Sequence, residues 1–322
     1  MPSTRALIHG IFVLLLPLIV AAFGLSVTTT AALVLATLIW RWLIVLAGLG
    51  RRPRGPGYEL ETISASHFVE KVRWCMDRLG LEYVEKPWVG TLGVFYKGRS
   101  VPQLFFQTGL ARSSIGNSAE ILRYLWGVSA GSSDEAAFLQ PTPERLELER
   151  RLDRYGVDLQ IWVYYHLLDH RDMTLHVWGV DNPAIPAWQR WLIRFLYPLQ
   201  AFLIKRAFRL DRARYEKSLQ SIEVLLEDMD TRLADGRVFI EGGETMDFTD
   251  IAFAAMCGVW LQPEAYGGGK AEAVRLHRER MPRPMQEDIR RWIEDYPRAV
   301  TFVERLYAKH RFGVEAEQEE PV

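Results

Sequence analysis

The sequence predicts an α/β domain followed by an all-α helical bundle domain, with two transmembrane helices in front of them. Three observations support this prediction. A run of 35 residues, from Ala6 to Trp40, contains no Asp, Glu, Lys or Arg. Strand and helix patterns alternate between residues 58 and 125, and the chain after Pro143 follows the helical period. A chain of 322 residues has room for about two domains that each bury a core.

The charge balance and the cysteine count exclude several classes of protein. The 39 lysines and arginines are balanced by 40 acidic residues, whereas a nucleic-acid-binding protein usually carries a strong positive excess. The two cysteines form no Cys-x-x-Cys pair, and they are too few for a disulfide framework or a zinc ribbon. We therefore expect neither a nucleic-acid partner nor a metal site.

The uncharged run is too long for one membrane span, which needs about 20 residues, and short for two. A polar stretch at residues 26–30 divides it into spans at about 8–25 and 30–49, so that residues 1–50 form a transmembrane hairpin. Arg41 lies about two turns from the end of the second span, so its side chain can reach the membrane surface. The alternative, an intramembrane site at Arg41, lacks an acidic partner in either span.

The charges that flank the spans predict their orientation. Arg5 precedes the first span and three arginines follow the second, while the loop between the spans is uncharged. The positive-inside rule then places both ends, and the soluble domains, on the cytoplasmic side of the membrane. A signal peptide cleaved near Ala22 is the alternative, and the second apolar run argues against it. Residues 51–57 form a basic linker that can also contact anionic lipid.

A βαβ unit follows the linker. Residues 58–63 alternate as a strand does, and apolar positions at i, i+4, i+7 and i+11 predict an amphipathic helix over residues 68–79. Ser66 is placed to cap this helix, and Gly80 to end it. Residues 82–86 form a second strand, and a single helical crossover between two strands implies a right-handed parallel pair.

The remainder of the α/β domain is short. Residues 101–106 predict a third strand that opens at Pro102, and residues 118–125 predict a helix. A stretch rich in Gly, Ser, Thr and Pro follows, which is typical of a domain boundary. We therefore place the α/β domain at residues 58–128 and an inter-domain linker at residues 129–143.

The all-α domain is predicted to occupy residues 144–312, followed by an acidic tail at residues 313–322. Asp247 and Asp250 have the spacing of a capping box that opens an apolar helix. The helices predicted with defined ends are residues 144–169, 213–233, 251–261 and 289–307.

One segment of the all-α domain, residues 184–209, combines an apolar stripe with many basic residues and is interrupted by Pro198. A cationic amphipathic helix rich in Trp and Phe is typical of a helix that lies in a membrane interface. A core helix of the bundle is the alternative, so the sequence leaves open whether this helix touches the membrane. The stripe consists of Trp188, Trp191, Leu192, Phe195, Leu196, Leu199, Phe202 and Leu203.

Two further patterns do not predict a site. His166 and His170 are four residues apart but lack the His-Glu-x-x-His spacing of a metal site. The three glycines at 267–269 precede Lys270 without the spacing or the preceding strand of a phosphate-binding loop, and so predict a loop between helices.

Four pieces of the chain resemble the cytosolic-type glutathione transferases. Residues 66–83 resemble the first helix of that family and the residues after it, and Val101-Pro102 resembles its cis-proline step. Residues 117–125 resemble the start of its third helix, and residues 247–252 its capping box. The pieces follow the family's order across about residues 58–312. The resemblance implies a thioredoxin-like domain followed by an all-α domain, glutathione as a substrate, and a homodimer.

The resemblance also implies how the thiol of glutathione becomes reactive. A free thiol has a pKa of about 8.5 and reacts as the thiolate, so the protein must stabilise the negative charge. Ser66 lies where a strand ends and a helix begins, so its hydroxyl and the helix N-terminus can point at one sulfur. Similarity to the serine-type members implies that Ser66 is the donor. A simple capping role for Ser66, and Ser64 as the donor, are the alternatives, and His67 stands where the family often has proline.

The other site residues also follow from the resemblance. A cis bond before Pro102 would offer the main chain of Val101 to the cysteinyl part of glutathione, and an ordinary trans proline is the alternative. Ser118, as the cap of the next helix, would hold the γ-glutamyl carboxylate. Asn117 stands where the family usually has an acidic residue, and Arg99 is the basic residue closest to the position that is usually basic.

These inferences predict a membrane-anchored protein, similar to glutathione transferases, that adds the glutathione thiolate to apolar electrophiles. Its predicted partners are glutathione, an apolar electrophile and the lipid bilayer. A non-catalytic binding module with this fold, tethered to the membrane, is the alternative. A glutathione-dependent reductase or peroxidase is disfavoured, because Ser66 occupies the place where a catalytic cysteine is needed.

Overall fold

The computed structural model describes residues 57–92, 101–108, 111–130 and 134–312, with a few residues between Ser26 and Leu43. Arg99, the acidic tail and almost all of the predicted hairpin and basic linker lie outside the described residues. Within the part of the chain that is described, no helix combines the length and the apolar character needed to cross a membrane. The residues of the second predicted span that are described, all helical, are Ala31, Ala32, Leu35, Ala36, Ile39 and Leu43.

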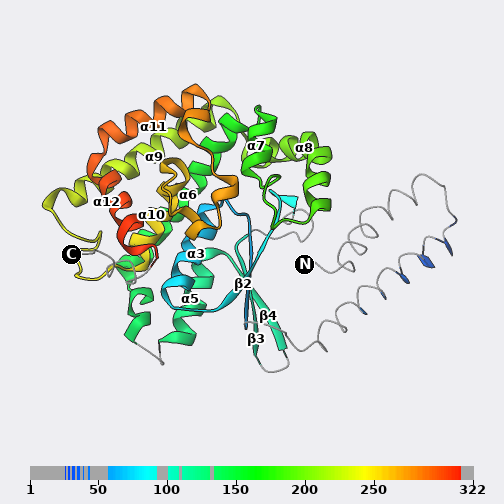
Figure 1. The fold of residues 1–322 in the computed structure, drawn as a ribbon, viewed down its shortest axis with the longest axis horizontal. Helices are drawn as coiled ribbons and strands as arrows, with labels where there is room; N and C mark the ends of the chain where they lie inside the picture. The colour runs from blue at the N-terminus through cyan, green and yellow to red at the C-terminus, as the bar shows by residue number, and fades with distance from the viewer. Residues whose placement is uncertain are drawn as a thin grey trace, which may run out of the picture.

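The N-terminal domain is built on a four-stranded sheet with the order β2-β1-β3-β4 (Figure 1). Strands β1 and β2 are parallel, and β3 is antiparallel to both β1 and β4. The crossover from β1 to β2 runs through α3, as predicted, so this is a thioredoxin-like βαβ sheet. The strands are β1 Tyr58–Thr62, β2 Tyr83–Pro87, β3 Gln103–Thr108 and β4 Ala111–Gly116, and the helices are α3 His67–Arg78 and α5 Ser118–Ser129.

The sequence did not predict strand β4. Its residues include only one large apolar side chain, Ile115, and therefore show no alternating pattern. Pairing with β3 makes this segment a strand, since Thr108 lies opposite Ala111 and Gln103 lies opposite Gly116. As the edge of the sheet, β4 needs only one partner strand.

The C-terminal domain is all α-helical. Figure 1 shows α6 and α10 between α3 and the outer helices α9 and α11. Its helices are α6 Pro143–Leu167, α7 Arg171–Val177, α8 Ala187–Phe208, α9 Arg212–Arg232, α10 Phe248–Leu261, α11 Arg283–Asp295 and α12 Pro297–His310. Single 3₁₀ turns are η1 Asp134–Leu139, η2 Leu233–Asp235, η3 Tyr266–Gly269, η4 Glu272–Val274 and η5 Arg278–Arg280.

The predicted capping box of α10 is confirmed. A carboxylate oxygen of Asp247 accepts from the backbone N–H of Thr249 at 2.7 Å, and Asp250 accepts from the N–H of Asp247 at 2.9 Å. Asp250 also accepts from the N–H of Ile240 at 2.9 Å, which joins the preceding turn to the helix. Because its first turn is satisfied in this way, α10 can run through the centre of the core.

One helix prediction was wrong, and one helix was not predicted. The single helix predicted over residues 289–307 is two helices, because Pro297 has no N–H to continue α11 and instead opens α12. Helix α7 was not predicted, since its seven residues are too few to show a helical period.

Helix α3 is buried on both sides, although the sequence predicted one buried face. Helix α5 packs against α3 within the N-terminal domain, while α10 packs against it from the C-terminal domain and α6 contacts it through His67 and Lys71. Residues 69–76 are therefore buried without exception, and three of them are charged: Glu70, Lys71 and Arg73.

The buried charges of α3 are all paired. The Arg73 guanidinium lies 2.6 Å from Glu85 and 3.1 Å from Glu70, and Arg311 at the end of α12 lies 2.7 Å from Glu70. Thr62 on β1 donates to Glu85 at 2.8 Å. These pairs join α3, the sheet and the last helix in one network, so each charge that leaves water gains a partner.

The three glycines at 267–269 form a loop between helices, as predicted, and the loop packs on this network. Gly267 and Gly268 have φ values of 74° and 58°, which favour glycine. A Cβ atom on Gly268 would lie 2.6 Å from the Arg311 guanidinium, and one on Gly267 would lie 3.3 Å from that of Arg73. The glycines thus allow the backbone to approach two buried cations.

Candidate functional site

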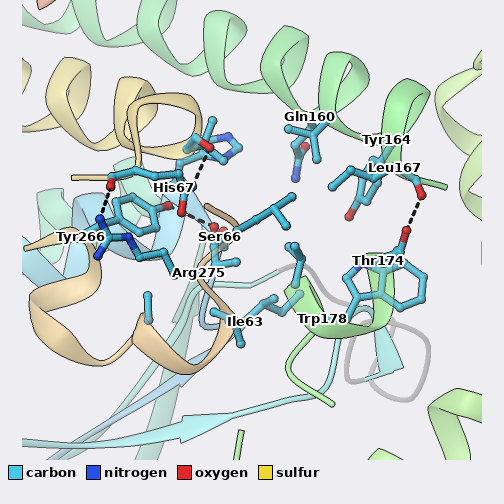
Figure 2. A pocket seen from close by; sticks show the side chains of 18 of the residues that line it. Ile63, Ser66, His67, Gln160, Tyr164, Leu167, Thr174, Trp178, Tyr266 and Arg275 are labelled. Carbon is cyan, nitrogen blue, oxygen red and sulfur yellow. Dashed lines mark hydrogen bonds between the residues drawn. The ribbon is translucent and has the colours of Figure 1, made fainter. Parts of the chain in front are cut away.

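A cavity of about 290 Å³ lies between the two domains, next to the N-terminus of α3 (Figure 2). Figure 2 shows Ser66 and His67 on one side, with Gln160 and Tyr164 of α6 and Trp178, the C-cap of α7, around the rest of the cavity. Most of the lining side chains are apolar, among them Ile63, Val101, Val163, Leu167, Trp178 and Phe208. The cavity therefore suits an apolar molecule that meets a few polar groups.

Ser66 occupies the N-cap position of α3 and lines this cavity. Its N–H donates to the carbonyl of Ile63 at 2.9 Å, and its own carbonyl accepts from Glu70 at 2.9 Å, which fixes the backbone. The Ser66 hydroxyl makes no capping hydrogen bond, so a simple capping role for this side chain is wrong. The hydroxyl instead lies at the positive end of α3, half-buried, on the cavity wall.

Ser64, the alternative donor, lies elsewhere. It is buried, and its hydroxyl accepts a hydrogen bond from the side-chain amide of Asn182 at 3.2 Å. Ser64 is not among the residues that line the cavity. Its side chain thus contributes to the contact between the domains.

His67 also joins the domains. Its Nε2 lies 2.9 Å from the carbonyl of Gly156 in α6, and burial lowers the pKa of the imidazole from 6.5 to about 4. A Cβ atom at position 156 would lie 2.7 Å from both Phe68 and Met256, so the close approach depends on glycine. At neutral pH, His67 is an uncharged donor to α6.

The Val101-Pro102 peptide bond is cis. Val101 lines the same cavity as Ser66, and Pro102 is buried at the start of β3. The structure therefore brings together Ser66 and Val101, which are predicted site residues from separate parts of the chain.

Asn117 and Ser118 lie at the N-terminus of α5 and do not line the cavity. The cap of α5 is Asn117, whose side-chain oxygen accepts from the N–H of Ala119 at 3.0 Å. Ser118 is the first helical residue and is buried, so the prediction that Ser118 caps this helix was wrong. The register of β3 and β4 pairs Gln103 with Gly116, which places the start of α5 beside the Pro102 end of β3.

Sequence reasoning missed most of the cavity wall. Gln160 and Tyr164 are four residues apart on α6, which puts them on one face, and burial raises the pKa of Tyr164 to about 12. Thr174 lies in the unpredicted helix α7, and Trp178 is its C-cap. Helical spacing identifies such a face, but it does not show that the face borders a cavity.

His166 and His170 do not line this cavity. His166 contacts the hydroxyl of Tyr215 at 3.3 Å, and His170 is the N-cap of α7. Among the residues that the structure describes, no group of three or more His, Cys, Asp or Glu side chains is placed to hold a metal ion.

Comparison with protein families gave no match, and comparison with curated proteins gave none. Among solved structures, the chain is similar to a glutathione S-transferase from Methylobacterium radiotolerans in complex with glutathione sulfonate. The identity is 17%, the match covers 79% of this chain and 92% of that one, and the TM-score is 0.48.

Two further solved structures are similar in the same way. One is a glutathione transferase family member from Pseudomonas fluorescens Pf-5 with two glutathione bound, at 17% identity, covering 80% of this chain and 91% of that one, with a TM-score of 0.45. The other is a glutathione S-transferase from Methylobacillus flagellatus KT with GSH bound. Its identity is 15%, the match covers 79% of this chain and 96% of that one, and the TM-score is 0.45. Likeness at this level concerns the fold and not the activity.

Proposed function

We propose that this protein binds glutathione where its two domains meet and adds the glutathione thiolate to apolar electrophiles held in the cavity. One observation carries the proposal. The Ser66 hydroxyl, at the N-terminus of α3, is not used to cap its helix and lies on the wall of a mostly apolar cavity that Val101 also lines. A hydroxyl and a helix N-terminus at one point can stabilise a thiolate.

The reaction requires a proton to leave before the carbon–sulfur bond forms. The thiol proton passes to water, and the thiolate that remains accepts a hydrogen bond from Ser66. The sulfur then attacks an electrophilic carbon, for example that of an aryl halide, and the halide leaves with the bonding electron pair. The apolar walls of the cavity hold the electrophile and exclude water from the sulfur.

The rest of the glutathione would extend along the edge of the thioredoxin-like domain. The main chain of Val101 would bind the cysteinyl part, and Ser118 and Asn117 would bind the γ-glutamyl part. The register of β3 and β4 supports this placement, since it sets the start of α5 beside Pro102. Backbone N–H groups at a helix N-terminus attract a carboxylate. Arg99 is proposed as a further basic contact.

A thiol-based reductase is a poorer explanation of the same site. Both cysteines are buried, and burial raises the pKa of Cys75 and of Cys257 to about 12. Neither thiol is therefore ionised at neutral pH, and neither lines the cavity.

We also propose that residues 1–50 anchor the protein in a membrane with both termini and both domains on the cytoplasmic side. The long uncharged run and the flanking arginines support this topology. A reporter fused after Val322 should be active on the cytoplasmic side. Activity on the opposite side would overturn the orientation.

The function is tested on the full chain in detergent. Glutathione is titrated into the protein by calorimetry, and the ultraviolet absorbance of the bound thiolate is followed against pH. We expect binding, and a bound thiol that ionises below the free-thiol pKa of about 8.5. Turnover is then measured with glutathione and 1-chloro-2,4-dinitrobenzene, an apolar aryl chloride.

Each result separates the alternatives. Binding with turnover supports the transferase. Binding with an unshifted thiol pKa and no turnover would overturn the transferase activity. The absence of binding would overturn the glutathione site and favour the non-catalytic module, which has this fold without a site for the tripeptide.

A further inference from the structure

Helix α8 packs on the protein with only one of its faces. Its buried apolar residues Ile193, Tyr197 and Ile204 belong to a cluster with Val89 and Trp178, apart from the main core. The side chain of Gln189 also accepts from the N–H of Val89 at 3.2 Å. This face therefore has its partners within the chain.

The opposite face of α8 is apolar and exposed. Trp191, Phe195, Leu199 and Phe202 fall at i, i+4, i+8 and i+11, and 66%, 72%, 53% and 60% of their respective surfaces are accessible. They form a stripe along a helix that lies at the edge of the molecule (Figure 1). A helix that is apolar on two opposite faces requires two apolar environments, and the protein supplies one of them.

The charges carried by this helix are all positive, and one of them, Lys205, pairs with Asp169 outside the helix at 2.7 Å. Helix α8 contains no acidic residue, while Arg190, Arg194, Lys205 and Arg206 lie on it and Arg209 follows at its C-cap. Cationic side chains beside an exposed Trp and Phe stripe complement anionic lipid headgroups above acyl chains. A second copy docked on the same stripe would bring two such basic sets together, which charge repulsion opposes.

We propose that α8 lies in the headgroup region of an anionic bilayer, with the Trp191–Phe202 stripe turned toward the acyl chains. The inference does not depend on the glutathione site. It also differs from a transmembrane anchor, because α8 would lie along the membrane surface while its inner face stays packed on the protein.

The test uses the full chain reconstituted into vesicles of equimolar phosphatidylglycerol and phosphatidylcholine. Cys75 and Cys257 are buried, so an introduced cysteine can be labelled selectively with an environment-sensitive dye. The labelled positions are Phe195→Cys and Phe202→Cys on α8. The control is Val224→Cys on α9, where the valine is similarly exposed at 57%.

We expect dyes at 195 and 202 to shift to the blue, to be quenched by spin-labelled lipid and to be protected from iodide. The dye at 224 should respond to iodide and not to the spin-labelled lipid. Replacing the exposed Arg194 and Arg206 by glutamine should weaken the bilayer-bound state by about fivefold per arginine, since one basic residue contributes about 1 kcal/mol at an anionic surface. Vesicles of phosphatidylcholine alone should weaken it as well.

Two results would overturn the inference. Iodide quenching at 195 and 202 equal to that at 224 would show that the stripe faces water. Protection from iodide without quenching by lipid, together with cross-linking between copies at 195, would show that the stripe is an interface between two chains.

Discussion

The middle and the N-terminus of α3 differ in how their polar side chains are paired. Along its middle, Glu70, Lys71 and Arg73 are completely buried, and each contacts an opposite charge within 3.1 Å. At its N-terminus, the Ser66 hydroxyl does not cap the helix, and His67 is held as a neutral imidazole. The protein itself supplies ion-pair partners for the three buried charges in the middle of the helix. The Ser66 hydroxyl makes no capping hydrogen bond to its helix, and it is the group that we propose donates to the glutathione thiolate.

The largest expected effect comes from breaking the buried ion pairs in the middle of α3. Arg73→Met leaves the carboxylates of Glu70 and Glu85 buried without their shared partner, which should lower the free energy of unfolding by about 3–5 kcal/mol. Denaturant unfolding in detergent measures the loss. The control is Arg290→Met, which breaks an exposed pair with Glu294 and should cost less than about 1 kcal/mol. Equal losses would contradict the difference between buried and exposed pairs.

The next effect is the pH dependence that His67 confers. Because its pKa is about 4 in the folded protein and 6.5 in the unfolded chain, the unfolded chain binds more protons between these values. The stability that the neutral imidazole contributes, about 3 kcal/mol, is present above pH 6.5 and is lost as the pH falls toward 4. Unfolding free energies measured from pH 4 to 7 test this. His67→Gln should remove that part of the slope, and parallel curves for the two proteins would refute the assignment.

A substitution of Ser66 at the N-terminus of α3 should change the reaction rate more than the free energy of unfolding. Ser66→Ala removes a charge-assisted hydrogen bond worth about 1.5–3 kcal/mol, so the bound thiolate and the rate should fall about ten- to a hundredfold. Glutathione affinity should change little, because the tripeptide is proposed to bind mainly through Val101 and Ser118. Ser64→Ala is the matched control, since that hydroxyl contacts Asn182. If Ser64→Ala abolished activity and Ser66→Ala did not, the donor would be misassigned.

The smallest effect concerns the cap of α5. Asn117→Ala removes the side-chain acceptor of the Ala119 N–H and should cost about 1 kcal/mol of stability. Asn117→Gly should cost less, because glycine accommodates the φ of 70° at this position. Thermal unfolding compares the two variants with the wild-type protein. A larger loss for glycine than for alanine would show that the backbone conformation matters little.

Local patterns predicted the parts of the fold that neighbouring residues determine. The β1–α3–β2 unit and the Asp247–Asp250 capping box were predicted correctly, since their signals lie within a few residues. Strand β4 was missed because its pairing with β3 defines it. The partners of the buried charges could not be predicted either, because Glu70 and Arg311 are 241 positions apart in the chain.

In the candidate site, too, local sequence predicted some residues, and the packing of distant segments determines the others. Ser66 could be placed at a helix start from the sequence, and the cis bond before Pro102 was expected from the resemblance. The cavity wall depends on how α6 and α7 pack against α3, and spacing along one helix does not specify that packing. The cap of α5 is Asn117 and not Ser118, a shift of one residue that the residue types do not determine, since both asparagine and serine are good N-caps.

The contact between α3 and the end of α12 has a consequence for biosynthesis. Glu70 receives Arg311, and the indole N–H of Trp74 donates to the carbonyl of His310 at 3.2 Å. A ribosome makes the chain from the N-terminus. More than two hundred further residues must therefore be synthesised after α3 before Arg311 and His310 are available to Glu70 and Trp74. Until residue 311 has been made, Glu70 and Trp74 lack these partners, so the contacts of α3 in the nascent thioredoxin-like domain are incomplete.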